Sequence, residues 1–277
     1  MKLRSTLFAF AALVVAPMAA GPAGAAALVA QYQFADANNL GLDSSGFGND
    51  LTNFGATQTA GHNAGSFGAQ FDGSDVMQRL GGMTGYDGKP GFTYAAWVNL
   101  SGPSPNTYFG IISQDFGACC DNRLLITETP SRHPYINEDN GTQSDRYLGA
   151  GAPIPLNTWF YIVMTGVDGL PFSTFHQGHV YVNGVELPDG SQNFFPKLTD
   201  LTGANTYLGA GEGGGLYRLF GILDDVRIYD GALNAGEVAT LYNSELTAVP
   251  TPAALALFLT GLSLAGFYTN RGSRRRS

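Results

Sequence analysis

The sequence predicts an all-β fold, an antiparallel β-sandwich or jelly roll. Ten short apolar or alternating runs recur along the chain, with Gly, Asn, Asp or Pro between them. The 38 glycines and a charged fraction of only 13% favour many tight turns over long helices. Short strands at this spacing are typical of two antiparallel sheets packed face to face.

The expected strands are short apolar or alternating runs bounded by turn residues. They span residues 28–34, 69–71, 76–80, 92–100, 107–113, 123–127, 158–165, 179–182, 206–208 and 219–229. Asn183-Gly184 predicts a hairpin, because Asn and Gly tolerate the positive φ of a tight turn. Residues 114–157 are mostly poorly patterned, and a long irregular stretch inside a compact domain is typical of functional or mobile segments.

One helix is expected near the end of the domain. Asn234 can cap it while Glu237, three residues on, reaches back to the cap. Val238, Leu241 and Tyr242 follow at helical spacing and give the helix an apolar face. We expect this helix to lie over one end of the sandwich.

Both ends of the chain predict export. At the start, Lys2 and Arg4 precede an apolar stretch, and either Ala23-Gly-Ala25 or Ala25-Ala-Ala27 would suit a signal peptidase. Residues 1–27 are therefore predicted to be a signal peptide that is removed on export.

At the other end, Val249-Pro-Thr-Pro252 precedes an apolar run, residues 253–268. As a helix this run would extend about 24 Å, enough for a short membrane span. The arginines after it, Arg271 and 274–276, would stay on the cytoplasmic side, because flanking basic residues resist translocation. A buried C-terminal helix is the alternative, but it would leave the clustered arginines and the two prolines unexplained.

This order of Val-Pro-Thr-Pro, apolar run and arginine cluster resembles the PEP-CTERM sorting signal over residues 249–276. Thr251 stands where that family usually has Glu. The resemblance implies that an exosortase recognises the tail, residues 246–277, during a transient insertion into the inner membrane. It further implies that the tail is removed and the protein released to the cell surface or the extracellular polymer.

The domain between the two signals, residues 28–245, is strongly acidic. Six of the 14 Lys and Arg lie in the signals, and the domain keeps the other 8 against all 22 acidic residues, a charge of −14. This charge argues against a nucleic-acid or anionic-membrane partner and favours Ca²⁺ or a neutral polysaccharide. The two cysteines, Cys119 and Cys120, are adjacent, and a strained disulfide ring and two free thiols both remain open.

Several segments together resemble the laminin-G-like, or concanavalin A-like, jelly-roll family over about residues 28–242. The block that closes the domain is the most specific of them. They are Leu28-Val-Ala-Gln-Tyr-Gln-Phe34, Asp43-Ser-Ser-Gly-Phe-Gly-Asn49, Phe71-Asp-Gly-Ser74, Phe92-Thr-Tyr-Ala-Ala-Trp-Val98, Trp159-Phe-Tyr-Ile-Val-Met-Thr165 with Val180-Tyr-Val-Asn-Gly-Val185, and Gly221-Ile-Leu-Asp-Asp-Val-Arg-Ile-Tyr229 with Ala232-Leu-Asn, Glu237 and Leu241-Tyr242.

The resemblance implies a sandwich that often holds one structural Ca²⁺ between its opening loop and its closing strand. Asp225 is the first candidate ligand, with Asp36 or Asp43 opposite, because Ca²⁺ prefers carboxylate and carbonyl oxygens. Strand alternation places Asp224 and Asp225 on opposite faces, so that only one of them turns inward. The alternative is a surface Asp225 that pairs with Arg227.

No catalytic residues are predicted. Glycoside hydrolases on this fold, as the resemblance implies, need two carboxylates about 5 to 10 Å apart. The chain's glutamates show no such pairing along a strand. The candidate ligand-binding residues instead lie in the 114–157 stretch, and a rival polysaccharide hydrolase or lyase would use the same residues. They are Arg123, His133, Tyr135 and Tyr147.

Aromatic residues in loops or at strand ends offer flat surfaces on which sugar rings stack. These are Tyr108, Tyr135, Tyr147, Phe172, Phe175 and Tyr217, whereas Trp97 and Trp159 lie inside apolar strands and are expected in the core. The sequence therefore predicts an exported, non-catalytic surface or matrix protein that binds or structures extracellular polysaccharide. A coat protein that contacts only itself is a further alternative.

Overall fold

The computed structural model describes residues 26–86, 91–102, 107–116, 121–127, 132–139, 144–147, 153–168, 176–188, 192–194 and 202–247. Nearly all of the predicted signal peptide, the tail beyond residue 247, Cys119 and Cys120 lie outside these residues. Among the described residues, no helix is long and apolar enough to cross a membrane.

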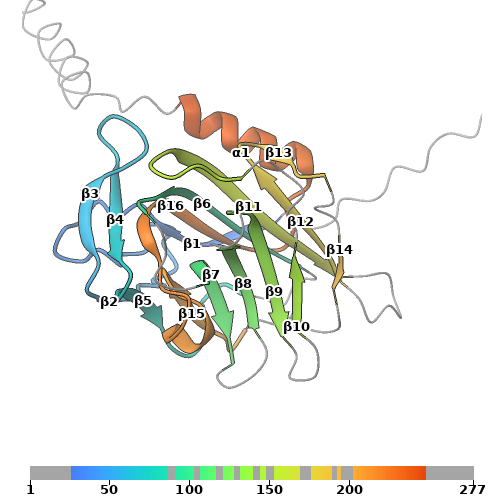
Figure 1. The fold of residues 1–277 in the computed structure, drawn as a ribbon. Coiled ribbons are helices and arrows are strands. Elements are labelled where there is room, and N and C mark those ends of the chain that lie inside the picture. The colour runs from blue at the N-terminus through green and yellow to red at the C-terminus, as the bar shows by residue number, and fades with distance from the viewer. Residues whose placement is uncertain are drawn as a thin grey trace, which may run out of the picture.

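The described strands form two antiparallel sheets that face each other (Figure 1). Sheet A contains, in spatial order, β13 (Val185–Glu186), β12 (His176–Val182), β11 (Trp159–Asp168), β6 (Phe92–Leu100), β16 (Phe220–Asp230), β4 (Phe67–Asp72) and β3 (Thr57–Ala60), with β1 (Ala27–Tyr32) on β16 and β14 (Gln192–Phe194) on β12. Sheet B contains β10 (Ser144–Tyr147), β9 (Pro134–Asp139), β8 (Asp121–Thr127), β7 (Tyr108–Asp115), β15 (Asn205–Leu208), β5 (Val76–Arg79) and β2 (Thr52–Phe54).

The long strand β16 is the centre of sheet A. Its first half pairs with β4 and its second half with β1, while β6 follows its other side. Between these halves the register with β6 shifts after Asp224, and Asp225 takes a positive φ of 43°. Such a bulge adds one residue to the strand and changes which side chains face outward.

The main hydrophobic core fills the space between the two sheets. Apolar side chains from alternate strand positions meet there, and Tyr32, Phe71, Phe92 and Phe109 are among those with almost no solvent exposure. Burying one large apolar side chain stabilises a fold by about 1.5–3 kcal/mol, so this core makes the main favourable contribution to the free energy of folding. No disulfide framework is needed to explain a domain with a core of this size.

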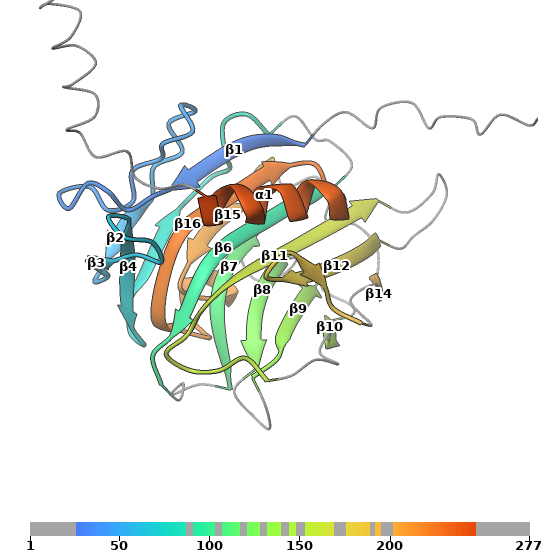
Figure 2. The ribbon, with the colours of Figure 1, turned by 90° about the horizontal axis from the view of Figure 1, so that it is seen from above.

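The predicted helix is present as α1 (Ala235–Thr247), and its capping box is formed as expected. The Glu237 N–H donates to Asn234 Oδ1 at 3.1 Å, and the Asn234 N–H donates to Glu237 Oε2 at 2.8 Å. The expected position was wrong. Figure 2 shows α1 lying across the outer face of sheet A instead of over one end of the sandwich. There Val238 packs against Trp97, Tyr161 and Tyr181 in a second apolar cluster.

All ten predicted strands are present, with ends that differ by a few residues. The Asn183-Gly184 turn is also confirmed, with φ values of 52° and 77°. The prediction of an irregular stretch was partly wrong, because β9 and β10 lie within residues 114–157. Their sequences, PYINED and SDRY, carry too few apolar residues to show alternation.

Candidate functional site

An aromatic cluster lies on the outer face of sheet B. It consists of Tyr108 from β7, Arg123 from β8, Tyr135 from β9, and Tyr217 from the loop before β16. The ring centroids of Tyr108 and Tyr135 are 4.9 Å apart and stacked, and Tyr217 meets Tyr108 edge-on at 5.0 Å. The Arg123 Cζ lies 5.9 Å from the centre of the Tyr217 ring, within cation–π range.

Strand alternation explains why these side chains point outward. In β8, Leu124 and Ile126 point into the main core, so Arg123, next to Leu124, faces the other side. Tyr135 pairs with Leu125, another outward residue of β8. The register of the sheet thus brings together residues that are distant in sequence.

A single glycine lets the Tyr217 loop pack against the sheet. The Gly110 N–H donates to the Tyr217 carbonyl at 2.6 Å. A Cβ at position 110 would lie 2.5 Å from that oxygen, so a larger residue would push the loop away. Tyr217 itself has a φ of 55°, a conformation that is rare for an aromatic residue and often accompanies functional loops.

Exposure divides the cluster into a rim and a base. Tyr108 and Tyr217 are half-buried, whereas Tyr135 is 7% exposed and Arg123 is 5% exposed. Half-exposed rings can stack against the C–H face of a sugar, and packing below holds them in place.

Two of the four candidate ligand-binding residues, Arg123 and Tyr135, lie together in this cluster. Tyr147 lies opposite Tyr135 in the register of β10 and β9. His133 precedes β9, where its N–H donates to Thr127 Oγ1 at 3.1 Å and its carbonyl accepts the Thr127 N–H. Phe172 and Phe175, which were expected to be exposed, lie outside the described residues.

The outer face of sheet A carries a different group of residues, all covered by α1 or by the β3–β4 loop. The His62 ring stacks on Trp97 with centroids 4.2 Å apart, and its Nδ1 lies 2.7 Å from Asp224 Oδ2. The same oxygen accepts the His62 N–H and the Ser66 hydroxyl, each at 2.9 Å. A Cβ at Gly61 would lie 2.2 Å from it, so glycine is required there.

This arrangement corrects the expectation for Trp97. The ring is buried, with 5% exposure, but it packs under α1 and not in the core between the sheets. Trp159 is partly buried in the same outer cluster. Sequence reasoning missed the His62 site, because His62 and Asp224 are 162 residues apart.

Asp225 and Arg227 form a buried ion pair on the same face. The Arg227 Nη2 lies 2.8 Å from Asp225 Oδ2 and 2.5 Å from Glu245 Oε1 in the last turn of α1. Because of the bulge in β16, both Asp224 and Asp225 face outward, while Leu223 and Val226 point into the core. The prediction that these two aspartates face opposite sides was therefore wrong.

The pKa values of this cluster follow from its burial. Burial, and after it the negative charge of Asp225, raise the pKa of Glu245, while Arg227 opposes both; the pKa that results is about 7. Burial lowers the pKa of Arg227, but Asp225 and Glu245 outweigh this effect and hold it above its ordinary value. Arg227 is therefore charged at any ordinary pH, whereas Glu245 titrates near neutrality.

Asp225, the first candidate calcium ligand, and its two alternative partners, Asp36 and Asp43, each have other contacts in the structure. Asp36 is exposed and accepts the Asn38 N–H at 2.9 Å, and Asp225 is paired with Arg227. Among the described residues, no group of three or more acidic, His or Cys side chains is arranged to hold a metal. Asp36, Asp43 and Asp225 thus do not fit a shared site, and calcium binding by this chain stays a prediction.

Asp43 uses all its acceptor positions within the opening loop. Its carboxylate accepts the N–H groups of Gln31, Ser45 and Asn49 at 2.9–3.0 Å and the Ser45 hydroxyl at 2.8 Å. Burial works to raise its pKa, but these bonds outweigh it and hold the pKa below the usual value. The Asp-Ser-Ser-Gly turn is therefore a structural anchor that holds this loop against the second half of β1.

Two other cavities lie near these sites. A pocket of about 290 Å³ opens beside His62, Asp224 and Glu245, with the exposed ring of Phe67 at its lining. A groove of about 740 Å³ lies at the β2–β3 end and is lined largely by amides and hydroxyls such as Asn39 and Asn53.

The comparisons with known proteins agree with this architecture. Residues 51–239 match the family model of the Concanavalin A-like lectin/glucanases superfamily. Comparison with curated proteins finds no match.

Among solved structures, the chain is similar to domain 4 of AbnA, a GH43 extracellular arabinanase from Geobacillus stearothermophilus, in complex with arabinotriose. The identity is 20% and the TM-score 0.57, over 78% of this chain and 98% of that one. It is also similar to the binding domain of Paraclostridial Mosquitocidal Protein 1, with 18% identity and a TM-score of 0.57, over 80% of this chain and 53% of that one.

The receptor binding domain of botulinum neurotoxin type G shows 15% identity and a TM-score of 0.52, over 79% of this chain and 51% of that one. The chain thus spans about half the length of these two toxin domains. At such identities the likeness concerns the fold alone. Since the family model matches well over half of the sequence, the chain belongs to the Concanavalin A-like lectin/glucanases superfamily.

Proposed function

We propose that this chain is an exported, non-catalytic carbohydrate-binding protein, and that the outer face of sheet B is its binding surface. The aromatic cluster of Tyr108, Arg123, Tyr135 and Tyr217 carries the proposal. Stacked and edge-on tyrosines with a guanidinium beneath them match what a neutral sugar chain needs. The complex of the similar arabinanase domain with arabinotriose supports the same ligand class.

The electrostatics of the domain favour a neutral glycan. With a charge of −14 over residues 28–245, the domain would repel an acidic polymer at low salt. The ligand would therefore be an uncharged part of an extracellular polysaccharide or biofilm matrix.

A binding titration tests the proposal. Purified protein is titrated with arabinotriose and with a panel of neutral oligosaccharides, and the same is done for Tyr217→Ala and Tyr108→Ala. Each variant is expected to weaken binding by about 2- to 12-fold, the value of one aromatic contact. Phe67→Ala is the matched control, because this ring is 42% exposed but lies on sheet A.

Three results would count against the surface or the function. If Phe67→Ala weakens oligosaccharide binding as much as the tyrosine variants do, the binding site lies on sheet A. If only Asn39→Ala weakens binding, the site is the groove at the β2–β3 end. New reducing or unsaturated ends after incubation with polysaccharide would replace the proposal by the rival hydrolase or lyase.

The export route is a separate proposal. A signal peptidase would remove residues 1–27, and an exosortase would process residues 246–277 after transient insertion in the inner membrane. The three-part order of the tail supports this route. The intact mass of the protein secreted by an exosortase-bearing bacterium tests it, because a mass that includes the arginine cluster would contradict tail removal.

A further inference from the structure

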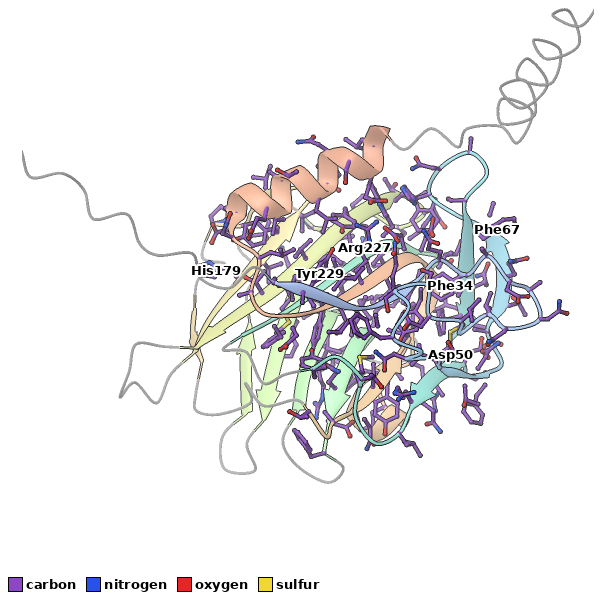
Figure 3. All side chains as sticks on the ribbon, turned by 180° about the vertical axis from the view of Figure 1, so that it is seen from behind. Phe34, Asp50, Phe67, His179, Arg227 and Tyr229 are labelled. Atoms are coloured by element: carbon purple, nitrogen blue, oxygen red, sulfur yellow. The ribbon has the colours of Figure 1, made fainter. Side chains whose placement is uncertain are left out.

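Three parts of the fold meet at one buried arginine. Arg227 lies on β16 beneath α1 (Figure 3), and it pairs in register with Gln31 of β1. Gln31 Nε2 donates to Asp225 Oδ1 at 2.6 Å. Arg227 then reaches Glu245 in the last turn of α1, so a single cluster joins the first strand, the last strand and the helix.

One nitrogen of Arg227 bridges the two carboxylates. Its Nη2 lies 2.8 Å from Asp225 Oδ2 and 2.5 Å from Glu245 Oε1. The side chains of Arg227, Asp225 and Glu245 are only 16%, 7% and 11% exposed, so water screens these charges weakly. Without a cation between them, the two buried carboxylates would repel each other.

We infer that Arg227 is an internal cation that does here the work of a structural metal ion. It neutralises the carboxylates of β16 and α1, and it clamps the end of the helix to the sheet without Ca²⁺. A Ca²⁺ ion bound at Asp225 would have to displace the guanidinium or lie against it, and both cost electrostatic energy. Asp43 cannot compensate, because its oxygens already accept four hydrogen bonds.

The guanidinium suits this role better than an ion from solution. It stays charged at any ordinary pH, it has five donors for neighbouring oxygens, and it cannot dissociate. The hydrogen bond from Asn63 Nδ2 to the Glu245 carbonyl, 3.0 Å long, adds a neutral contact at the same point. The clamp therefore depends on residues of this chain alone.

Thermal unfolding of the full chain tests the inference. Melting is measured after treatment with excess EDTA and again after addition of CaCl₂, and neither is expected to shift the Tm of the wild type. Arg227→Met is expected to lower the Tm by about 6 to 20 °C, since it leaves two buried carboxylates without a cation. Arg79→Met is the control: it removes a half-buried arginine whose Nε donates to the Gly82 carbonyl, and a smaller shift of the Tm is expected.

A triple variant keeps the test decisive if Arg227→Met does not fold. This variant combines Asp225→Asn, Arg227→Met and Glu245→Gln, which removes all three charges and keeps side chains of similar shape. It should recover most of the Tm that Arg227→Met alone loses. The inference is overturned if EDTA lowers the wild-type Tm and Asp225→Asn abolishes that response. It is equally overturned if Arg227→Met melts like Arg79→Met.

Discussion

The two outer faces of the sandwich carry similar aromatic residues in opposite settings. On sheet A, Trp97 and Tyr161 are buried beneath α1 together with a network of ion pairs. On sheet B, Tyr108 and Tyr217 remain half-buried, and no helix of the described residues covers them; Tyr217 comes from the loop that contains the short 3-10 turn Glu212–Gly214. Tyrosine and tryptophan thus serve stability on one face and are available for binding on the other.

The difference follows from what covers each face. On sheet A, the helix excludes water, so polar groups such as Asp224 must find partners inside the protein. On sheet B, the rim tyrosines Tyr108 and Tyr217 keep part of their surface in solvent. The comparison shows that residue type alone does not mark a ligand site; a ring must also be left partly uncovered.

Replacing Trp97 by Ala is the most severe way to break the covered face. The ring is 5% exposed and contacts His62, Tyr161 and Tyr242. The variant is expected to lose about 3–5 kcal/mol of unfolding free energy. Urea denaturation measures this loss. A smaller loss than that of an exposed aromatic variant such as Phe54→Ala would contradict the role of Trp97 in stabilising the covered face.

Asp224→Ala should have the next largest effect. It removes the acceptor for three donors, namely the His62 N–H, the His62 ring and the Ser66 hydroxyl. Leaving buried donors unpaired costs about 1–3 kcal/mol. Denaturant titration gives the value, and Ser66→Ala, which removes one donor and leaves the rest of the network, should lose clearly less.

Glu245 should give the covered face a smaller, pH-dependent contribution. Its folded pKa of about 7 lies above the ordinary value of 4.5, so the folded state holds this proton more tightly than the unfolded state. The resulting stability is full below about 4.5 and is lost as the pH rises through about 7.

The difference in Tm between wild type and Glu245→Gln isolates this contribution from the other carboxyls. Because Gln stays neutral, the Tm of the wild type should fall relative to the Tm of Glu245→Gln between about pH 5 and 8, the interval in which Glu245 ionises. A difference that stays flat over this range would show that Glu245 does not titrate there.

Tyr217→Ala should have the smallest effect on stability and a clear one on binding. A half-exposed loop residue away from the core changes the unfolding free energy by less than about 0.5 kcal/mol. Calorimetry and denaturation on the same sample therefore separate the two faces. If Tyr217→Ala unfolds as easily as Asp224→Ala, the rim of sheet B is structural and not a binding surface.

The local features of the fold were predictable because each depends on neighbours in sequence. The ten strands, the Asn183-Gly184 hairpin and the capping box of α1 all rest on residues at most a few positions apart. Among the strands that were not predicted, β9 and β10 lack apolar alternation; β9 is held by backbone pairing with β8, and β10 by backbone pairing with β9. Such pairing leaves little trace in a single sequence.

The candidate sites were only partly predictable. Arg123 and Tyr135 were named from the composition of their stretch, but nothing showed that Tyr217 would join them over the sheet. The Asp225–Arg227 pair was foreseen as an alternative, whereas its third member, Glu245, lies 18 residues beyond Arg227 on another element.

The sequence by itself determined the class of fold, the helix and its cap, and the acidic charge of the domain, because these follow from local pattern and composition. Only the tertiary structure decided which aromatics are covered, which carboxylates share Arg227, and that the bulge turns both Asp224 and Asp225 outward. The physical reason is that register, bulges and helix docking set contacts between different elements, and a one-residue shift in a strand reverses every face.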